Sequence, residues 1–185
     1  MPAAIVLGGE MKAIQTTWFC ALVLAGASAF AHGNGPTDPQ IAAIVVVANQ
    51  VDVDAGKLAQ QKSDAKEVRE FAALMVTDHT AVNKSAGELV QKLKVTPEAN
   101  PTSASLQKGG DENLAKLKGL KGAAFDKAYV DHEVAYHEAV IQALDGTLIP
   151  GAHNAELKAL LVQVRPAFIA HLEHARQLQK RLAGG

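Results

Sequence analysis

Four ionisable residues occupy positions where an amphipathic helix should bury an apolar side chain. Each interrupts a stripe of mainly aliphatic residues spaced three or four positions apart: Asp52, His79, His137 and His171. A buried carboxyl group or imidazole is unfavourable unless it is hydrogen-bonded, paired with a charge or bound to a metal. Since each lies in a different predicted helix, a bundle would bring the four together, which is how helical bundles build metal sites.

The residue types suit a transition metal. Imidazole nitrogens with one or two carboxylates are typical ligands of Zn, Cu, Fe or Ni, whereas Mg and Ca prefer oxygen ligands. Glu133 stands four residues before His137, one residue more than in the Glu-x-x-His motif of di-iron bundles. This donor set is rich in histidine and poor in carboxylate, so it predicts a single ion of Zn, Cu or Fe. The predicted ligands are His79, His137, His171, Asp52 and Glu133.

Further residues are candidates for a supporting position behind these ligands: Asp78, His132, His174 and Tyr129. His132 and His174 have a second interpretation as exposed residues. A metal-free cluster is the alternative for the whole set, because a core histidine is usually hydrogen-bonded to an acid or a carbonyl, and Asp78 and Asp52 could accept such bonds. His32 is a separate copper(II) candidate, since signal cleavage after Ala31 would place its imidazole beside the new terminal amine.

Long helices are needed to position these residues, and the sequence predicts four, near 40–62, 64–94, 122–145 and 154–182. Asp38-Pro39 is typical of a helix start, and Ser63 and Asn154 are expected to cap the second and fourth helices. Pro166 falls inside the last helix and predicts a kink there.

A long linker is expected between the second and third helices, over 96–121, opened by Pro97 and Pro101. Within it, 111–118 could form a short extra helix. No segment alternates with the period of two that strands show. We therefore expect an all-α, ferritin-like four-helix bundle over 38–182, in which either a crossover or an up-down-up-down topology would cluster the candidate ligands.

The N-terminus has the three parts of a secretory signal peptide. Met11-Lys12 is basic, an apolar run follows over 18–24, and small residues lead to Ala31. Cleavage is expected after Ala29 or Ala31. The signal peptide would span 1–31, and its first ten residues precede a better start at Met11.

The composition excludes several classes of function. Lys and Arg total 18 against 19 Asp and Glu, which argues against a nucleic-acid binder or a polybasic membrane module. Cys20, in the signal peptide, is the only cysteine, so the mature chain would have no disulfide, thiolate ligand or cysteine nucleophile. No later run is long and apolar enough to span a membrane. A periplasmic or secreted bacterial protein is expected.

Several motifs resemble those of the DUF4142 family. They are Ala55-Gly56-Lys57-Leu58-Ala59, Phe71-Ala72-x-x-Met75-x-x-Asp78-His79, Phe125-Asp126-x-x-Tyr129 and Arg165-Pro166-x-Phe168-x-x-His171-Leu172. The resemblance covers about 38–182 and implies an exported bacterial protein with a ferritin-like bundle and no settled biochemical role. The family usually has Glu where this chain has Asp52.

Two classes of function remain open at this point. One is a metal-binding bundle of the periplasm that serves metal handling or protection from oxidative stress. The other is a metal-free structural or interaction module with a protein partner in the cell envelope. An enzyme is a weaker interpretation, because the sequence has no nucleophile elbow, phosphate-binding loop or Ser-His-Asp pattern, and we expect no catalytic residues. The oligomeric state is left open.

Overall fold

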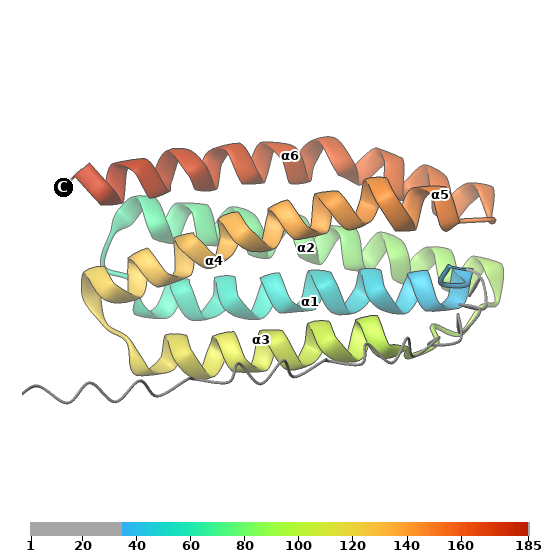
Figure 1. Cartoon of the computed structure of the whole chain (residues 1–185), viewed down its shortest axis with the longest axis horizontal. Coiled ribbons are helices and arrows are strands. Elements are labelled where there is room, and N and C mark those ends of the chain that lie inside the picture. The colour runs from blue at the N-terminus through green and yellow to red at the C-terminus, as the bar shows by residue number, and fades with distance from the viewer. Residues whose placement is uncertain (1–34, 185) are drawn as a thin grey trace, which may run out of the picture. The chain divides into compact units, whose positions relative to one another are not determined.

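The computed structural model describes residues 35–184, and all regular structure in this range is helical. Its five long helices are α1 (Asp38–Lys62), α2 (Lys66–Leu93), α3 (Pro101–Gly119), α4 (Gly122–Ala143) and α6 (Ala155–Gly184) (Figure 1). A π-helical turn, η1 (Leu144–Leu148), and the short α5 (Ile149–Gly151) join α4 to α6. The all-α prediction is confirmed, whereas the expected signal peptide and His32 lie outside the described residues.

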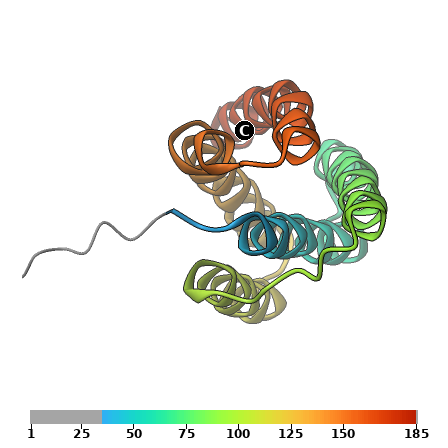
Figure 2. The ribbon, with the colours of Figure 1, turned by 90° about the vertical axis from the view of Figure 1, so that its right-hand side faces the viewer.

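Consecutive long helices run antiparallel (Figure 1). Helices α2 and α4 therefore point in the same direction, because α3, which separates them in the sequence, runs back along the bundle. Seen along the helix axes, α1, α2, α6 and α4 surround one core, and α3 packs against the outer side of α1 (Figure 2). Of the two topologies left open by the sequence, the chain therefore has the crossover, and α3 forms most of the connection between α2 and α4. Among the described residues, no helix is both long and apolar enough to cross a membrane.

The expected linker over 96–121 is mostly a fifth helix, so the prediction of four helices with only a short turn over 111–118 is wrong. Pro101 is at the first position of α3, where its missing N–H breaks no hydrogen bond. Asn100 caps this helix by accepting hydrogen bonds from the backbone N–H groups of Thr102 and Ser103. A proline after a helix can thus begin the next one, provided that a capping residue precedes it.

The ends of the other helices agree with the sequence patterns except at α2. Thr37 and Gln40 form a reciprocal capping box at the start of α1. Ser63, expected to cap α2, instead accepts a hydrogen bond from the Ala65 backbone N–H, and α2 begins at Lys66 with Ala65 in the cap position. Pro166 lies inside α6, which continues through it to Gly184.

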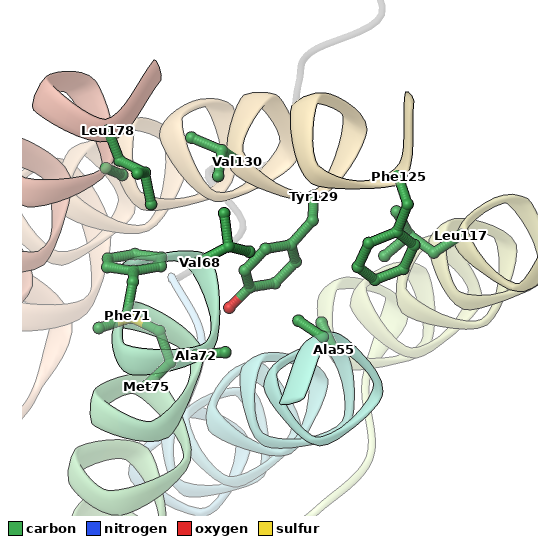
Figure 3. Close-up of a cluster of buried hydrophobic side chains, with 12 residues drawn as sticks. Ala55, Val68, Phe71, Ala72, Met75, Leu117, Phe125, Tyr129, Val130 and Leu178 are labelled. Atoms are coloured by element: carbon green, nitrogen blue, oxygen red, sulfur yellow. The ribbon is translucent and has the colours of Figure 1, made fainter. Parts of the chain in front are cut away.

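Two apolar clusters fill the core. One contains the aromatic rings of Phe71, Phe125 and Tyr129 (Figure 3). The other surrounds Ile41, near the opposite end of the helices, and includes Phe168. Along all four core helices, the residues of these clusters flank a central layer that is polar. The fold thus positions its ionisable residues in the middle of the bundle, where solvent is excluded from both ends.

The contact between α3 and α1 can be tested with two adjacent glycines of α3. A Cβ atom at Gly110 would lie 2.6 Å from Cγ2 of Val51, whereas one at Gly109 would have no neighbour within 4 Å. In a helix interior, alanine is generally more favourable than glycine by up to about 1 kcal/mol, and this gain applies to both positions. Overpacking costs about 1 to 3 kcal/mol, and this loss applies only to Gly110. We expect Gly110→Ala to be less stable than Gly109→Ala by about 1 to 3 kcal/mol in urea unfolding. Equal stability of the two variants would show that α3 does not pack closely on α1.

Candidate metal centre

Three histidine rings from three helices face one another in the polar layer. His79 of α2, His137 of α4 and His171 of α6 are 1%, 1% and 3% exposed. The ring centroids are 5.5 Å apart for His79 and His137, 5.3 Å for His79 and His171, and 5.5 Å for His137 and His171. Their position follows from the sequence pattern, since each ring replaces an aliphatic side chain in the core-facing stripe of its helix.

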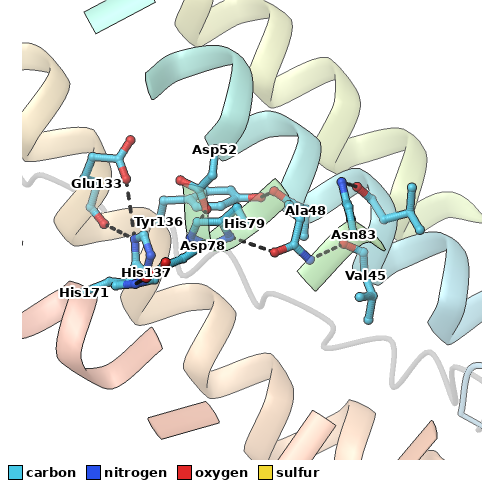
Figure 4. A network of polar contacts seen from close by, with 12 residues as sticks. Val45, Ala48, Asp52, Asp78, His79, Asn83, Glu133, Tyr136, His137 and His171 are labelled. Atoms are coloured by element: carbon cyan, nitrogen blue, oxygen red, sulfur yellow. Dashed lines mark hydrogen bonds and ion pairs between the residues drawn. The ribbon is translucent and has the colours of Figure 1, made fainter. Parts of the chain in front are cut away.

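Asn49 of α1 fixes the tautomer of His79. The Asn49 side-chain amide donates a hydrogen bond of 2.7 Å to the Val45 carbonyl, which leaves the Asn49 Oδ1 atom as an acceptor. His79 Nδ1 lies 2.7 Å from that oxygen and therefore donates to it (Figure 4). Because a neutral imidazole carries one proton, the lone pair of His79 is then on Nε2.

The other two rings are held in the same manner by different acceptors. His137 Nδ1 donates to the backbone carbonyl of Glu133, one turn earlier in α4, at 3.0 Å. His171 Nε2 lies 2.9 Å from a carboxylate oxygen of Asp78, a partly exposed residue of α2. The lone pairs are then on Nε2 of His137 and Nδ1 of His171. Asp78, one of the residues predicted to lie behind the ligands, therefore contacts the predicted ligand His171.

The remaining nitrogen of each ring has no hydrogen-bond partner within the described part of the chain. The three histidines each offer one ring nitrogen, and these atoms all lie within 4.8 Å of one another. Metal-bound histidine typically shows this pattern, with one nitrogen on the ion and the other hydrogen-bonded to a carboxylate or a carbonyl. The arrangement can therefore supply three convergent imidazole lone pairs to one ion.

Two buried carboxyl groups lie beside the rings. Asp52 of α1 is 2% exposed and Glu133 of α4 is 0% exposed. An oxygen of Asp52 is 3.4 Å from His79 Nε2, and Asp52, Glu133 and His137 also offer ligand atoms within 4.8 Å of one another. Asp52 Oδ1 and both Glu133 oxygens lack hydrogen-bond partners. Tyr129, predicted as a supporting residue, is fully buried in the same region.

Burial sets the protonation of this layer. It lowers the pKa of His79 to about 3 and that of His137 to about 4, with Asp52 opposing the shift at His137. Burial also raises the pKa of Asp52, and it raises the pKa of Glu133 well above its usual range, where the nearby Asp52 adds to the effect. His79 and His137 are therefore neutral at pH 7, which is the form that binds a metal.

His132 and His174 do not join the cluster. His132 stacks on the ring of Tyr136 at 5.4 Å, on the side of α4 that faces α3. His174 packs edge-on against Phe71 at 5.1 Å. His132 lies five residues before His137 in α4, and His174 lies three residues after His171 in α6. Both side chains are therefore on helix faces next to the one that carries the cluster.

Sequence patterns did not identify two residues that contact the histidines. One is Asn49, for which a polar side chain three residues before Asp52, in an otherwise apolar helix segment, is a usable signal. The other is Phe168, an apolar residue of the last helix whose ring lies 5.0 Å from His79, 6.2 Å from His137 and 6.0 Å from His171. An aromatic residue one turn before a histidine has no sequence feature that separates such a contact from ordinary core packing.

Fold and site together define an all-helical bundle with a buried layer of histidines and carboxyl groups at its centre. The chain belongs to the DUF4142 family, a domain of unknown function, which matches residues 24–178. The resemblance inferred from the sequence motifs is confirmed. No curated protein matches the sequence.

Two solved structures share the fold. A DUF305 protein from Streptomyces coelicolor, described as secreted, superposes with a TM-score of 0.64 at 14% identity, covering 78% of this chain and 92% of that chain. CopM in its Cu(II)-bound form superposes with a TM-score of 0.60, also at 14% identity, covering 78% of this chain and 97% of CopM. At this identity the likeness concerns the helical fold.

His132 allows a test of how burial affects stability with pH. Burial, with a smaller effect of the Lys116 charge, lowers its pKa to about 4 in the folded chain from 6.5, the ordinary value of histidine. As the pH falls, His132 therefore takes up a proton in the unfolded chain before it does so in the folded chain. The stability that neutral His132 contributes to the fold is present above about pH 6.5 and is lost toward pH 4. From pH 7 to pH 5, we expect wild type to lose about 1 to 2 kcal/mol more stability than His132→Gln. Urea unfolding of both metal-free proteins at the two pH values measures this, and equal losses would contradict it.

Proposed function

We propose that this protein binds one transition-metal ion in the polar layer of its bundle and serves metal handling in the bacterial envelope after export. The proposed ligands are the free nitrogens of His79, His137 and His171, with Asp52 and Glu133 beside them. Asp78 and Tyr129 are proposed to support the ligands. The same four helices α1, α2, α4 and α6 would form the ferritin-like part of the fold.

One observation carries this proposal. Each of the three histidines has one nitrogen committed to an oxygen acceptor and the other buried and unpartnered, and one ring nitrogen of each lies within 4.8 Å of one ring nitrogen of each of the others. An unsatisfied buried polar group costs about 1 to 3 kcal/mol. Three imidazoles oriented in this way are therefore costly to the fold unless an additional group binds them, and a metal ion satisfies all three at once.

The charges of the layer also fit an ion. A buried cation is tolerated where negative groups compensate it. Asp52 and Glu133 can together supply two negative charges when ionised, which matches one divalent ion with neutral histidines. Zn, Cu and Fe all accept imidazole with carboxylate, so the donor set supports the metals expected from the sequence.

The comparisons support the context of the proposal. CopM, which has the same fold, is known in a Cu(II)-bound form, and the DUF305 neighbour is described as secreted. Export of this chain is proposed from the signal-peptide pattern over 1–31. A periplasmic or extracellular site of action would place the protein where metal ions arrive from the surroundings of the cell.

Thermal unfolding separates metal binding from a purely structural role of the histidines. A ligand at 100 times its dissociation constant stabilises the folded state by about 2.7 kcal/mol, or several degrees for a domain of this size. We expect added Zn(II) or Cu(II) to raise the midpoint of the wild-type chain and to have little effect on His79→Ala.

His174→Ala is the matched control, because it removes a histidine that lies outside the cluster, and it should respond to metal like wild type. An unchanged wild-type midpoint, or equal increases for wild type and His79→Ala, would reject the metal site. The cluster would then be structural, as in the metal-free envelope module considered from the sequence.

Asn49 provides a second test, because it touches the proposed ligand and not the ion. Loss of the hydrogen bond behind a ligating histidine typically weakens metal binding about 10- to 100-fold. We expect Asn49→Ala to lower the affinity by this factor, measured by competition with a chromogenic chelator. Gln50→Ala, a change at the exposed neighbouring position, should leave the affinity unchanged. Equal affinities of Asn49→Ala and wild type would show that His79 does not bind the ion.

A further inference from the structure

The three histidines and Phe168 restrict how an ion can be coordinated. Phe168 lies three residues before His171 in α6, and Glu133 lies four residues before His137 in α4. Because α4 and α6 are antiparallel (Figure 1), Phe168 and Glu133 lie on opposite sides of the layer formed by the three rings. The Phe168 ring is only 4% exposed and stacks on His79 with an interplanar angle of 21°. One side of the histidine layer is thus closed by an apolar ring.

The other side of the layer carries the carboxyl groups. Asp52 Oδ2 lies 3.4 Å from the free Nε2 of His79. Asp52 and His137 also offer ligand atoms within 4.8 Å of one another, so the Asp52 carboxyl group is near two of the three rings. A fourth ligand can therefore come from this side. The Asp52 carboxyl group is the one closest to a free histidine nitrogen, and in its present position it groups with Glu133 and His137 and not with all three histidines.

The ring separations indicate the coordination geometry. With a metal–nitrogen bond of about 2.0 to 2.1 Å, a bound imidazole ring has its centroid about 3.2 Å from the ion. Three such rings are then about 5.2 Å apart in a tetrahedral site and about 5.5 Å apart in a trigonal one. A tetragonal site would instead give two separations of about 4.5 Å and one of about 6.4 Å. The observed values of 5.3, 5.5 and 5.5 Å correspond to the threefold arrangement.

The distance from His79 to Asp52 leads to the same geometry. Two ligand atoms of a tetrahedral zinc site are about 3.4 Å apart, whereas adjacent ligands in a square plane are about 2.9 Å apart. The observed 3.4 Å separates His79 Nε2 from Asp52 Oδ2. Zn(II) has no geometric preference of its own and commonly adopts a tetrahedral site, whereas Cu(II) favours a tetragonal one.

We infer that the ion is Zn(II), bound four-coordinate by His79, His137, His171 and Asp52 in a site without an open position. This inference rests on the proposed metal-binding function and specifies its ion and geometry. All four ligands come from the protein, and Phe168 closes the face opposite Asp52. Sites of this closed kind hold zinc, whereas catalytic zinc keeps one position for water or substrate. The protein would therefore hold zinc within its fold, with no position at the ion for water or a substrate.

The test uses metal content and the spectrum of a cobalt-substituted protein. The mature chain, purified from the periplasm without a histidine tag, should contain one zinc per chain. Co(II) in place of zinc should give the intense visible bands of a four-coordinate ion. Weak bands of six-coordinate cobalt, or copper or iron as the native metal, would overturn the inference while leaving a metal-binding function intact. Absence of any bound metal, together with no stabilisation by added metal, would reject both.

Asp52→Asn tests the fourth ligand, and Asp54→Asn is its control. Asp54 lies on the same helix and its carboxylate accepts a hydrogen bond from Gln50 at 2.8 Å, away from the histidines. We expect Asp52→Asn to weaken zinc binding by more than the 10- to 100-fold typical of a lost supporting group, and to change the cobalt bands. Asp54→Asn should behave as wild type in both measurements. Unchanged cobalt bands in Asp52→Asn would show that Asp52 is not a ligand, and if that variant does not fold, the wild-type cobalt spectrum still decides the geometry.

Discussion

The structure depends on a layer of ionisable side chains held in the middle of an apolar bundle. Five of these groups are at most 3% exposed, and they have apolar clusters on both sides. Water cannot satisfy them there, so each must find a partner within the protein or on a bound ion. One nitrogen of each histidine has such a partner, which is an asparagine, a backbone carbonyl or an aspartate. The other nitrogen has none among the described residues, and this difference between the two nitrogens of each ring gives the cluster its chemistry.

The helices position this layer through their directions as much as through their contacts. Because α3 returns the chain along the outside of α1, helices α2 and α4 run parallel to each other, and each presents a buried histidine to the core. The antiparallel α6 contributes His171 at the same level and places Phe168 on the side away from the carboxyl groups. The topology thus fixes the order of the side chains along the bundle axis. An aromatic ring comes first, three imidazoles follow, and two carboxyl groups come last. The proposed metal ion would therefore have one face to which oxygen ligands could bind.

Much of this arrangement could be predicted from the sequence, because it depends on helical periodicity. The interruption of four apolar stripes by Asp52, His79, His137 and His171 correctly indicated that these side chains meet in the core. Periodicity gives a residue's face and level, and it carries no information on neighbours that are themselves apolar or amide side chains. Asn49 and Phe168 were missed for that reason. The error at α3 has another cause, since Pro101 is compatible with both a linker and a helix start, and only the capping contacts of Asn100 distinguish the two.

The positions of the hydrogen-bond acceptors explain how the three rings keep one orientation in the folded chain. Asn49 is on the same helix as Asp52, and the Glu133 carbonyl is on the same helix as His137, so two acceptors are held in place by α-helical geometry. Asp78 is adjacent in sequence to His79, yet it supports His171 across the interface of α2 and α6. The three rings are therefore oriented before any ion binds, and the ligands lose little conformational freedom on binding. Binding energy that is not needed for ordering the ligands adds directly to the stability of the folded chain, because the unfolded chain has no such site. If the proposed ion binds, a preformed layer of this kind would couple occupancy of the site to the stability of the whole bundle.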